Sequence, residues 1–186
     1  MDLKTRGHGA DAAAHAFGTA MATSVSVVLS GESEQLFMII PLTGSSAPRA
    51  QDRPVRVRAL RGSESNDFAE VLGAGLGAPP VIISSAYTPA VLDAQEASAY
   101  LAEIDGVAVA AGLGVVAEGH VGLINIATLP RYRRRGHAQL VIERILSDGR
   151  AVGAHTAHLH ASNETVSLFE SVGFRITEKW TSLTAV

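Results

Sequence analysis

The chemistry most clearly marked in this chain lies at residues 133–138, whose sequence is RRRGHA. A run of apolar and β-branched residues, INIATLP at 124–130, precedes this segment, and an amphipathic helical pattern follows it. This order predicts a strand, a short loop and a helix N-terminus, where backbone N–H groups and the positive end of the helix dipole favour an anion. Gly136 and Ala138 lack bulk, so a phosphate group could approach the main chain closely.

Composition restricts the class of protein that carries this loop. With 186 residues, 47% of them hydrophobic, the chain can form one sizeable core and is not of the disordered class. The absence of cysteine excludes a disulfide scaffold, a thiol nucleophile and a cysteine-based zinc site. A net charge of −3 argues against a general nucleic-acid-binding protein. No apolar stretch is long enough to span a bilayer, and His15 interrupts the only signal-like segment, so we expect a cytoplasmic protein.

The elements that must position the loop are well marked in the second half of the chain. The patterns predict a helix at 89–101 after Thr88, strands at 101–104 and 107–116 joined by a turn at 105–106, a strand at 120–128 after a turn at 118–119, a helix with an apolar face over 138–146, a strand at 155–161, a helix capped by Asn163 and ended by Gly173, and a last strand at 174–180. This order predicts an α/β (α+β) fold in which helices pack against a mixed sheet.

The first third of the chain carries weaker signals. They predict a helix at 12–21, two strands at 24–29 and 35–40 that form a hairpin across 31–34, a loop at 43–54, a strand at 55–59, and a short helix from 65 through 72 ended by the glycines at 73, 75 and 77. We therefore expect an extension at 1–54, which could add a sheet edge or a dimer contact, and a domain at 55–186. Two questions stay open: whether the extension is part of that domain, and whether the protein forms a homodimer.

Three features together resemble a known family. Arg133-x-x-Gly136-x-Ala138 after a strand matches the Q/R-x-x-G-x-G/A motif of the GNAT superfamily (GCN5-related N-acetyltransferases). Asn163 follows the next strand, and LFESVGF at 168–174 is similar to the family's L-Y-E-x-x-G-F segment. The resemblance extends from about Tyr100 to the C-terminus. It implies the GNAT fold, a central, mostly antiparallel sheet flanked by helices, with a V-shaped splay between its two central strands.

The resemblance also implies a donor substrate and a reaction. Acetyl-CoA, or another short acyl-CoA, would give its acyl group directly to a primary amine in a ternary complex, without a metal. The positions that match the family's contacts to the donor are Ile126, Ala127, Thr128, Arg133, Arg134, Arg135, Gly136, His137, Ala138, Asn163 and Phe169. A backbone N–H near 126–128 would stabilise the negative charge that develops on the thioester oxygen.

Proton transfer has several candidates. The family often has tyrosine at the position of Phe169, where its phenol protonates the departing thiolate, so Ser167 or water would have to take that task here. An amine nucleophile also needs a base with a pKa near neutrality. His160 is the first choice, followed by His120 and Glu118; His158 shares a strand face with His160, because side chains alternate along a strand.

Other interpretations remain open. The loss of the phenol leaves room for a catalytically silent acyl-CoA-binding or regulatory module. The run Arg131 to Arg135, with its interleaved Tyr132, leaves room for nucleic-acid binding, although we expect neither a nucleic-acid nor a membrane partner. The histidines at 155, 158 and 160 lack a matching carboxylate, so we expect no metal site. The acceptor pocket would be built by residues 65–77 and 87–101, and its amine could belong to a small molecule, an amino acid, an antibiotic or a protein.

Overall fold

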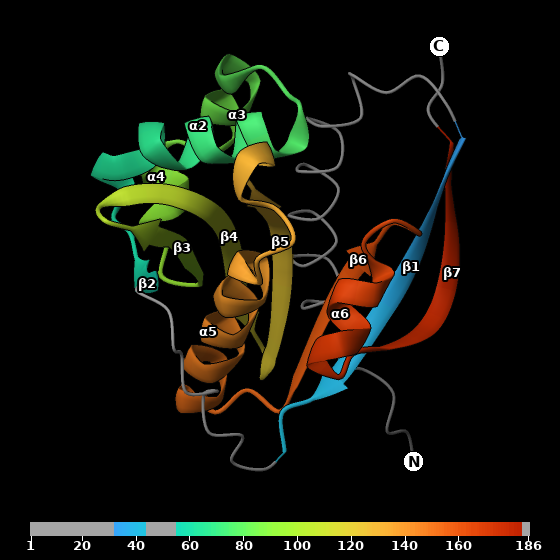
Figure 1. Cartoon of the computed structure of the whole chain (residues 1–186). Coiled ribbons are helices and arrows are strands. Elements are labelled where there is room, and N and C mark those ends of the chain that lie inside the picture. Colours follow the sequence, from blue (N-terminus) through green and yellow to red (C-terminus); the bar gives the residue numbers. More distant parts are fainter. Residues whose placement is uncertain (1–31, 44–54, 184–186) are drawn as a thin grey trace, which may run out of the picture. The chain divides into compact units, whose positions relative to one another are not determined.

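The computed structural model describes residues 32–43 and 55–183 (Figure 1). By its contacts the chain divides into two compact units, and the larger one is Glu34–Trp180. The strands form one sheet in the order β2-β3-β4-β5-β6-β1-β7. They are β1 (Glu32–Pro41), β2 (Val55–Ala59), β3 (Ala97–Ile104), β4 (Val107–Ala117), β5 (His120–Thr128), β6 (Thr156–Ala161) and β7 (Arg175–Leu183). The helices are η1 (Gly62–Glu64), α2 (Ser65–Leu76), α3 (Pro80–Ala86), α4 (Pro89–Leu92), η2 (Pro130–Tyr132), α5 (His137–Ala151) and α6 (Val166–Val172).

The pairing of the strands confirms a mixed, mostly antiparallel sheet. The pairs β2–β3, β3–β4, β4–β5 and β1–β6 are antiparallel, and β5–β6 is parallel. The turns that join β3 to β4 and β4 to β5 contain Asp105-Gly106 and Glu118-Gly119, all four with positive φ, as the sequence predicts for tight hairpins. The predicted strands at 55–59 and 120–128 and the predicted helix after the arginine loop are confirmed as β2, β5 and α5.

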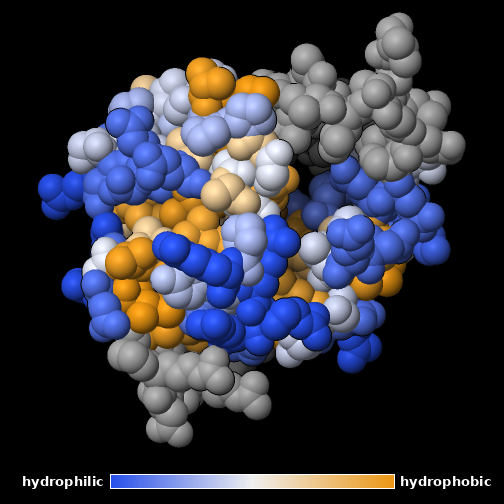
Figure 2. All heavy atoms as spheres, turned by 45° about the horizontal axis from the view of Figure 1, so that its top comes forward, coloured by the Kyte–Doolittle hydropathy of each residue, from blue (hydrophilic) through white to orange (hydrophobic). Residues whose placement is uncertain are grey.

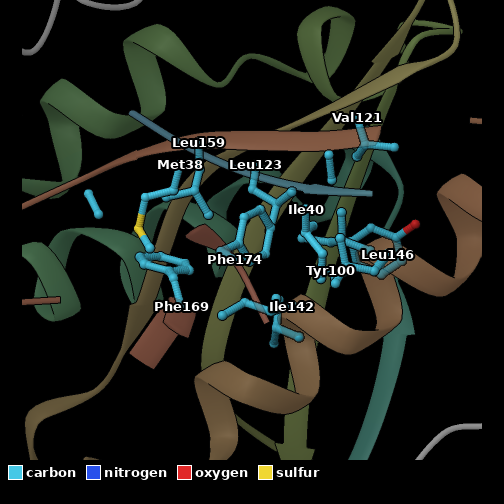
Figure 3. Packing of buried hydrophobic residues seen from close by; sticks show 14 of the residues in the cluster. Met38, Ile40, Tyr100, Val121, Leu123, Ile142, Leu146, Leu159, Phe169 and Phe174 are labelled. Atoms are coloured by element: carbon cyan, nitrogen blue, oxygen red, sulfur yellow. The ribbon is translucent and has the colours of Figure 1, made fainter. Parts of the chain in front are cut away.

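The sheet is covered by α5 and α6 on one face and, over β4 and β5, by α2 on the other. A cluster of buried side chains lies under α5 and α6, and Figure 3 shows Phe169 of α6 and Phe174 packed among side chains of the sheet. On β3, Tyr100 and Ala102 belong to this cluster, whereas Ala99 and Leu101 are equally buried but do not, as expected for alternate residues facing opposite sides. The α2 face is packed so closely that a Cβ on Gly75 would lie 2.7 Å from Ala127 Cβ of β5.

The predicted helix at 89–101 is wrong. α4 ends at Leu92, and the chain from Ala97 onward is strand β3, paired with β4 from Ala97↔Val115. The alanines of this segment favour a helix weakly, but pairing with β4 outweighs that local preference. Asp93 instead anchors the end of α4, since its Oδ1 accepts the N–H of Gly62 at 2.7 Å. Helix α3, which begins with Pro80 at its first position, is not among the predicted elements.

Two helix ends also differ from the prediction. α2 continues through Gly73 and Gly75 to Leu76, and only Gly77, with φ 72°, ends it. Asn163 does not cap α6: the N-cap is Thr165, and the carbonyl of Ser162 accepts the N–H groups of Thr165 and Val166. Gly173 ends α6 in the left-handed conformation, as predicted.

Strand β1 lies inside the sheet, between β6 and β7. It pairs with β6 from Leu36↔Ala161 to Pro41↔Thr156, which confirms the strand predicted at 35–40 but not a turn at 32–34, since these residues already belong to β1. β1 itself is therefore not a sheet edge. The predicted elements at 12–21 and 24–29, and the loop after residue 43, lie outside the described residues. A domain boundary after residue 54 stays a prediction.

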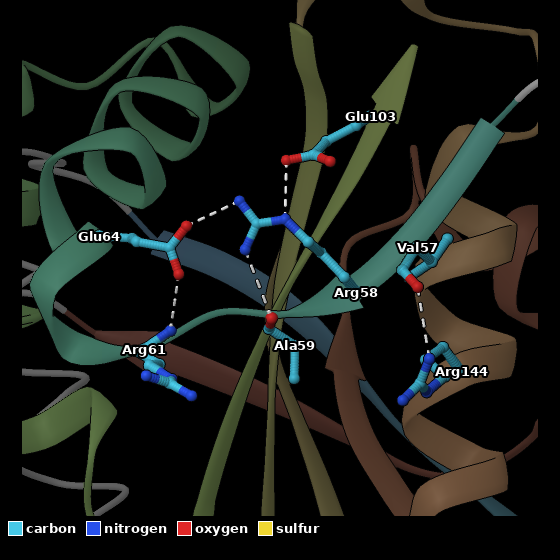
Figure 4. Close-up of polar contacts among 7 residues, drawn as sticks. All are labelled: Val57, Arg58, Ala59, Arg61, Glu64, Glu103 and Arg144. Atoms are coloured by element: carbon cyan, nitrogen blue, oxygen red, sulfur yellow. Dashed lines mark hydrogen bonds and ion pairs between the residues drawn. The ribbon is translucent and has the colours of Figure 1, made fainter. Parts of the chain in front are cut away.

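Two arginines tie the helical segments to the sheet (Figure 4). Arg58 of β2 donates to Glu64 of η1 at 2.7 Å and to Glu103 of β3 at 2.8 Å. The hydrogen bond from Arg58 is the main cause that lowers the pKa of Glu64. Arg144 of α5 donates to the carbonyl of Val57 at 3.3 Å, so α5 is held to strand β2 as well as to the core. These contacts join β2 to η1, β3 and α5.

Candidate active site

The strands β5 and β6 pair at only three positions and then separate. The pairs are His120↔Thr156, Val121↔Ala157 and Gly122↔His158, whereas β5 continues to Thr128 and β6 to Ala161 with no further pair between them in the described residues. We call the space beyond Gly122 and His158 the β5–β6 opening; Figure 1 shows the two ribbons diverging there. The divergence is the splay that the family resemblance implied.

The backbone of β5 presents its polar groups to this opening at alternate residues. Leu129 N donates to Val109 O of β4 at 2.9 Å, and Ala127 and Thr128 stand opposite Ala111 and Ala110. In an antiparallel ladder successive residues point their N–H and C=O groups to opposite sides. Ala127 therefore bonds toward β4, while Ile126 and Thr128 face the opening.

A β-bulge precedes these residues. The register shifts between Leu113↔Ile124 and Ala111↔Ala127, so Asn125 and Ile126 stand opposite Gly112 alone. Asn125 takes the left-handed conformation with φ 49°. Its side-chain Nδ2 donates a hydrogen bond to the hydroxyl of Tyr87, which follows α3. The side chain of Asn125 thus lies on the α3 side of the sheet.

The loop after β5 leads to a helix N-terminus, as the sequence predicts. Arg134 and Gly136 both have positive φ, 61° and 82°, and α5 begins at His137 directly after Gly136. No side-chain hydrogen bond caps α5, and a Cβ built on Gly136 would meet no atom within 4 Å. A 15-residue helix with this kind of start suits an anion.

The side chains of the loop are mostly used within the protein. Arg133 donates to the carbonyl of Gly75 in α2 at 2.7 Å and to that of Thr128 at 3.4 Å, so it braces the loop against α2. Arg131 and Arg135 lie over the ring of Tyr132, with their guanidinium carbons 5.0 and 5.8 Å from its centroid. His137 is buried at the start of α5, beside Tyr132. Thr128 Oγ1 is buried without a hydrogen-bond partner among the described residues.

The candidates for proton transfer fall into two groups. His158 and His160 lie on β6 at and beyond the last β5–β6 pair, on the side of the opening. His120 and Glu118 lie at the other, closed end: His120 Nδ1 contacts the hydroxyl of Thr156, and Glu118 is in the β4–β5 turn with φ 49°. The structure therefore brings His158 and His160 to the opening, whereas His120 lies two residues before it on β5 and Glu118 lies in the turn that precedes β5.

The two histidines at the opening have different surroundings. The ring of His160 lies 5.1 Å from that of Phe37 and 5.0 Å from that of Trp180, and burial lowers its pKa. A Cβ on Gly122 would lie 3.4 Å from His158 Nε2, which places this ring directly over the point where the strands part. Burial lowers the pKa of His158, and the nearby His120 and His160 lower it further. The sequence places His158 and His160 on one strand face, and the pairing of His158 with Gly122 is a contact that the sequence does not reveal.

The remaining predicted residues lie on the segment after β6. Asn163 is exposed in the turn before α6, and Ser167 is exposed on α6. The ring of Phe169 is buried in the core, edge-on to Phe174 with centroids 6.0 Å apart. The structure therefore places Phe169 primarily as a core residue.

Comparison with known families decides what this arrangement belongs to. The model of the Acetyltransferase (GNAT) family matches residues 75–174, more than half of the chain. The chain belongs to the GNAT acetyltransferase family. The match spans β3–β6 with the arginine loop, α5 and α6, so it includes every element that forms the opening.

Solved structures agree with the GNAT fold. A putative GNAT acetyltransferase from Novosphingobium aromaticivorans superposes with a TM-score of 0.61 at 23% identity, over 81% of this chain and 63% of that one. The ribosomal-protein-S18-alanine N-acetyltransferase from Escherichia coli gives a TM-score of 0.57 at 18% identity, over 67% of this chain and 79% of that one. AAC(6')-Iy, in complex with the bisubstrate analog CoA-S-monomethyl-acetylneamine, gives a TM-score of 0.58 at 21% identity, over 71% of this chain and 98% of that one. No protein with a curated description matches the chain.

The family match identifies an acetyltransferase domain of the GNAT type at residues 75–174. The chain's alignment to the Novosphingobium protein spans less than two thirds of that protein's length. None of the helices in the described residues is both long and apolar enough to cross a membrane. Within those residues, no group of three or more His, Asp or Glu side chains is placed to hold a metal ion.

Proposed function

We propose that the chain transfers the acetyl group of acetyl-CoA, or another short acyl group, to a primary amine by direct attack in a ternary complex. The observation that carries the proposal is the separation of β5 from β6 directly beside the start of α5, where no side chain caps the helix. A donor with a long arm and a pyrophosphate needs a slot next to an anion site. The neighbour AAC(6')-Iy, whose ligand contains CoA, supports this donor.

On the donor side, we assign the main-chain groups at 134–138 to the pyrophosphate and the outward N–H groups of Ile126 and Thr128 to the donor's arm and carbonyl oxygen. Thr128 Oγ1, buried and unsatisfied, is a further candidate contact. Acetyl-CoA supplies an activated thioester; the protein's task is to hold it and stabilise the charge on its oxygen. Ala127 bonds toward β4, so it contributes shape rather than hydrogen bonds to the donor. Asn163 and Phe169 remain proposed donor contacts, the latter through its ring.

On the acceptor side, we assign the general base to His158, with His160 as the second candidate. The amine nitrogen forms its bond to the carbonyl carbon, the carbon–sulfur bond breaks, and His158 Nε2 takes the proton that the nitrogen loses. Its lowered pKa keeps the imidazole neutral at pH 7, as a base must be. His160, held between Phe37 and Trp180, is better placed to line the amine's approach.

We expect the acceptor to approach from the sheet face that carries α2, α3 and these rings, because α5 and α6 cover the other face. This surface mixes apolar and polar groups: Leu76 of α2 and Val81 of α3 are 45% and 71% exposed. Figure 2, in which the top of Figure 1 comes forward, shows hydrophobic and hydrophilic residues side by side at the end of the molecule where α2 and α3 lie. The identity of the amine is left to a screen.

The anion site is tested by Gly136→Ala. Gly136 has φ 82° and open space where a Cβ would be, so alanine would bring strain of about 1 kcal/mol and place a methyl group where we propose phosphate binds. We expect KM for acetyl-CoA to rise about tenfold, since loss of about 1.4 kcal/mol of binding has that effect. Gly153→Ala is the matched control, because Gly153 has φ 89° and the same open space beyond the far end of α5. Equal changes in KM for both variants would contradict the assignment.

Phe169→Tyr tests the missing acid. Because the ring packs against Phe174 in the core, a new hydroxyl should lower the free energy of unfolding by about 1–3 kcal/mol. We expect kcat to change less than twofold. If the CoA thiol has a pKa of about 8.5, like that of cysteine, its thiolate can leave near neutral pH without protonation by an acid. Steady-state kinetics and chemical denaturation measure both. A tenfold rise in kcat would show instead that the ring edge faces the leaving sulfur.

The proposed function is tested by release of free CoA from acetyl-CoA when a panel of primary amines is supplied, with a thiol reagent as readout. We expect release that depends on one class of amine. A catalytically silent acyl-CoA-binding module is the second candidate, favoured by the packing of Phe169 in the core. It would bind acetyl-CoA yet release no CoA with any amine. Nucleic-acid binding is disfavoured, because Arg133 donates a hydrogen bond to the carbonyl of Gly75 and the guanidinium groups of Arg131 and Arg135 stack on the ring of Tyr132.

A further inference from the structure

Tyr87 and Asn125 form a partly buried polar contact between the residue after α3 and the bulge of β5. The ring of Tyr87 has no exposed surface and packs edge-on against Phe68 of α2, with centroids 5.2 Å apart. Its hydroxyl accepts the hydrogen bond from Asn125 Nδ2. Asn125, the partner of this hydroxyl, is the residue with positive φ in the bulge.

The bulge decides which residues of β5 face the opening. Without the extra residue, the ladder would continue from Leu113↔Ile124 to place Ile126 opposite Ala111. The N–H of Ile126 would then point to β4, and that of Ala127 would point to the opening. With the bulge, Ala127 stands opposite Ala111, and Ile126 presents its N–H to the opening. The left-handed conformation of Asn125 therefore decides which backbone N–H can donate a hydrogen bond to the thioester oxygen.

Asparagine tolerates the left-handed conformation better than most residues, but still at a cost that neighbouring contacts must offset. The hydrogen bond to Tyr87 is such a contact, and it is anchored in a rigid place because Tyr87 is packed on Phe68 and cannot follow a moving strand. Burial raises the pKa of Tyr87 to about 12, so its hydroxyl stays neutral across the working pH range. The contact is therefore present whenever the enzyme works.

We propose that Tyr87 is a positioning residue, which acts through Asn125 to hold the bulge of β5 so that the N–H of Ile126 points at the thioester oxygen. The inference rests on the proposed function. It assigns a catalytic effect to a buried tyrosine of the α3 segment, outside the donor loop and outside the strand that carries the bases. The effect belongs to the chemical step, because the donor's pyrophosphate is held elsewhere, at the start of α5.

The test uses Tyr87→Phe and Asn125→Gly in the full chain. Phenylalanine keeps the packing on Phe68 and removes only the hydroxyl; glycine keeps the left-handed backbone accessible and removes only the amide. We expect kcat to fall about tenfold in each, part of the effect of losing an oxyanion donor outright, with KM for acetyl-CoA within twofold of wild type. The double variant should fall no further than either single one, because both remove the same contact.

Tyr100→Phe is the matched control. Tyr100 is also buried, and its hydroxyl donates to Asp148 of α5 at 2.9 Å on the opposite face of the sheet. It should lose stability as Tyr87→Phe does, but keep kcat. If wild type releases CoA while Tyr87→Phe and Asn125→Gly both keep kcat within twofold, or if Tyr100→Phe loses as much, the inference is overturned. If wild type itself releases no CoA with any amine, the proposed function has failed instead.

Discussion

His158→Gln lowers kcat/KM about a hundredfold, if His158 is the base that accepts the amine's proton. General-base catalysis by a positioned side chain typically contributes a factor of about 10²–10⁴. Glutamine keeps a polar side chain of similar size over Gly122 but cannot take a proton, so the donor's KM should stay near that of wild type. Steady-state kinetics with the best amine of the panel measure this. His155→Gln is the control, because His155 precedes β6 at the closed end, beside His120.

The pH dependence gives this prediction a second readout. A base works in its neutral form, and burial together with His120 and His160 holds the pKa of His158 below its ordinary value of 6.5. As the pH falls at saturating substrates, the decline of kcat should therefore begin at a lower pH than an ordinary histidine would give. His158→Gln should remove this acid limb. If His160→Gln abolishes the limb and His158→Gln leaves it in place, the roles of the two histidines are reversed.

Gly75→Ala is expected to destabilise the protein and to damage the donor site together. In an exposed helix this change would stabilise by about 1 kcal/mol. Here the new Cβ would lie 2.7 Å from Ala127 Cβ and 3.2 Å from Thr128 N, and a strand backbone cannot yield as a flexible side chain can. We expect the free energy of unfolding to fall by about 2 kcal/mol, within the range for overpacking, and KM for acetyl-CoA to rise as α2 moves away from Arg133 and β5.

Gly77→Ala is the control for this prediction. Gly77 ends α2 with φ 72° and has no atom within 4 Å of a built Cβ, so alanine there brings only backbone strain of about 1 kcal/mol. KM for acetyl-CoA should not change. Denaturant unfolding and donor kinetics on the two variants separate the effects. A stabilised Gly75→Ala protein with an unchanged KM would show that α2 does not press on β5.

The parts of the fold that the sequence predicts are those whose local chemistry leaves little choice. Tight hairpin turns require positive φ, which the pairs Asp105-Gly106 and Glu118-Gly119 adopt. Gly136 precedes an amphipathic run with the period of a helix. The loop before α5 depends on these local signals, and its position between β5 and the helix start is confirmed. The helix at 89–101 was wrong because Ala97 and its neighbours join a strand by pairing with β4, and no pattern within the segment reveals that partner.

The parts that the sequence could not predict depend on contacts between distant residues. β1 lies between β6 and β7, which no pattern within its own residues indicates. The bulge at Asn125 interrupts a run that has the pattern of a regular strand, and the residue that its side chain contacts, Tyr87, is 38 residues earlier in the chain. The position of His158 over the separating strands is of the same kind, because it depends on pairing with Gly122 and not on the pattern within β6.

Binding of acetyl-CoA in the β5–β6 opening is the step on which all these assignments depend, and isothermal titration of wild type and Gly136→Ala with acetyl-CoA measures it without any acceptor. We predict one site per chain in wild type, about tenfold weaker binding in Gly136→Ala, and wild-type affinity in Gly153→Ala. No binding to wild type at millimolar acetyl-CoA would contradict a donor site in the opening, as would binding that Gly136→Ala leaves unchanged.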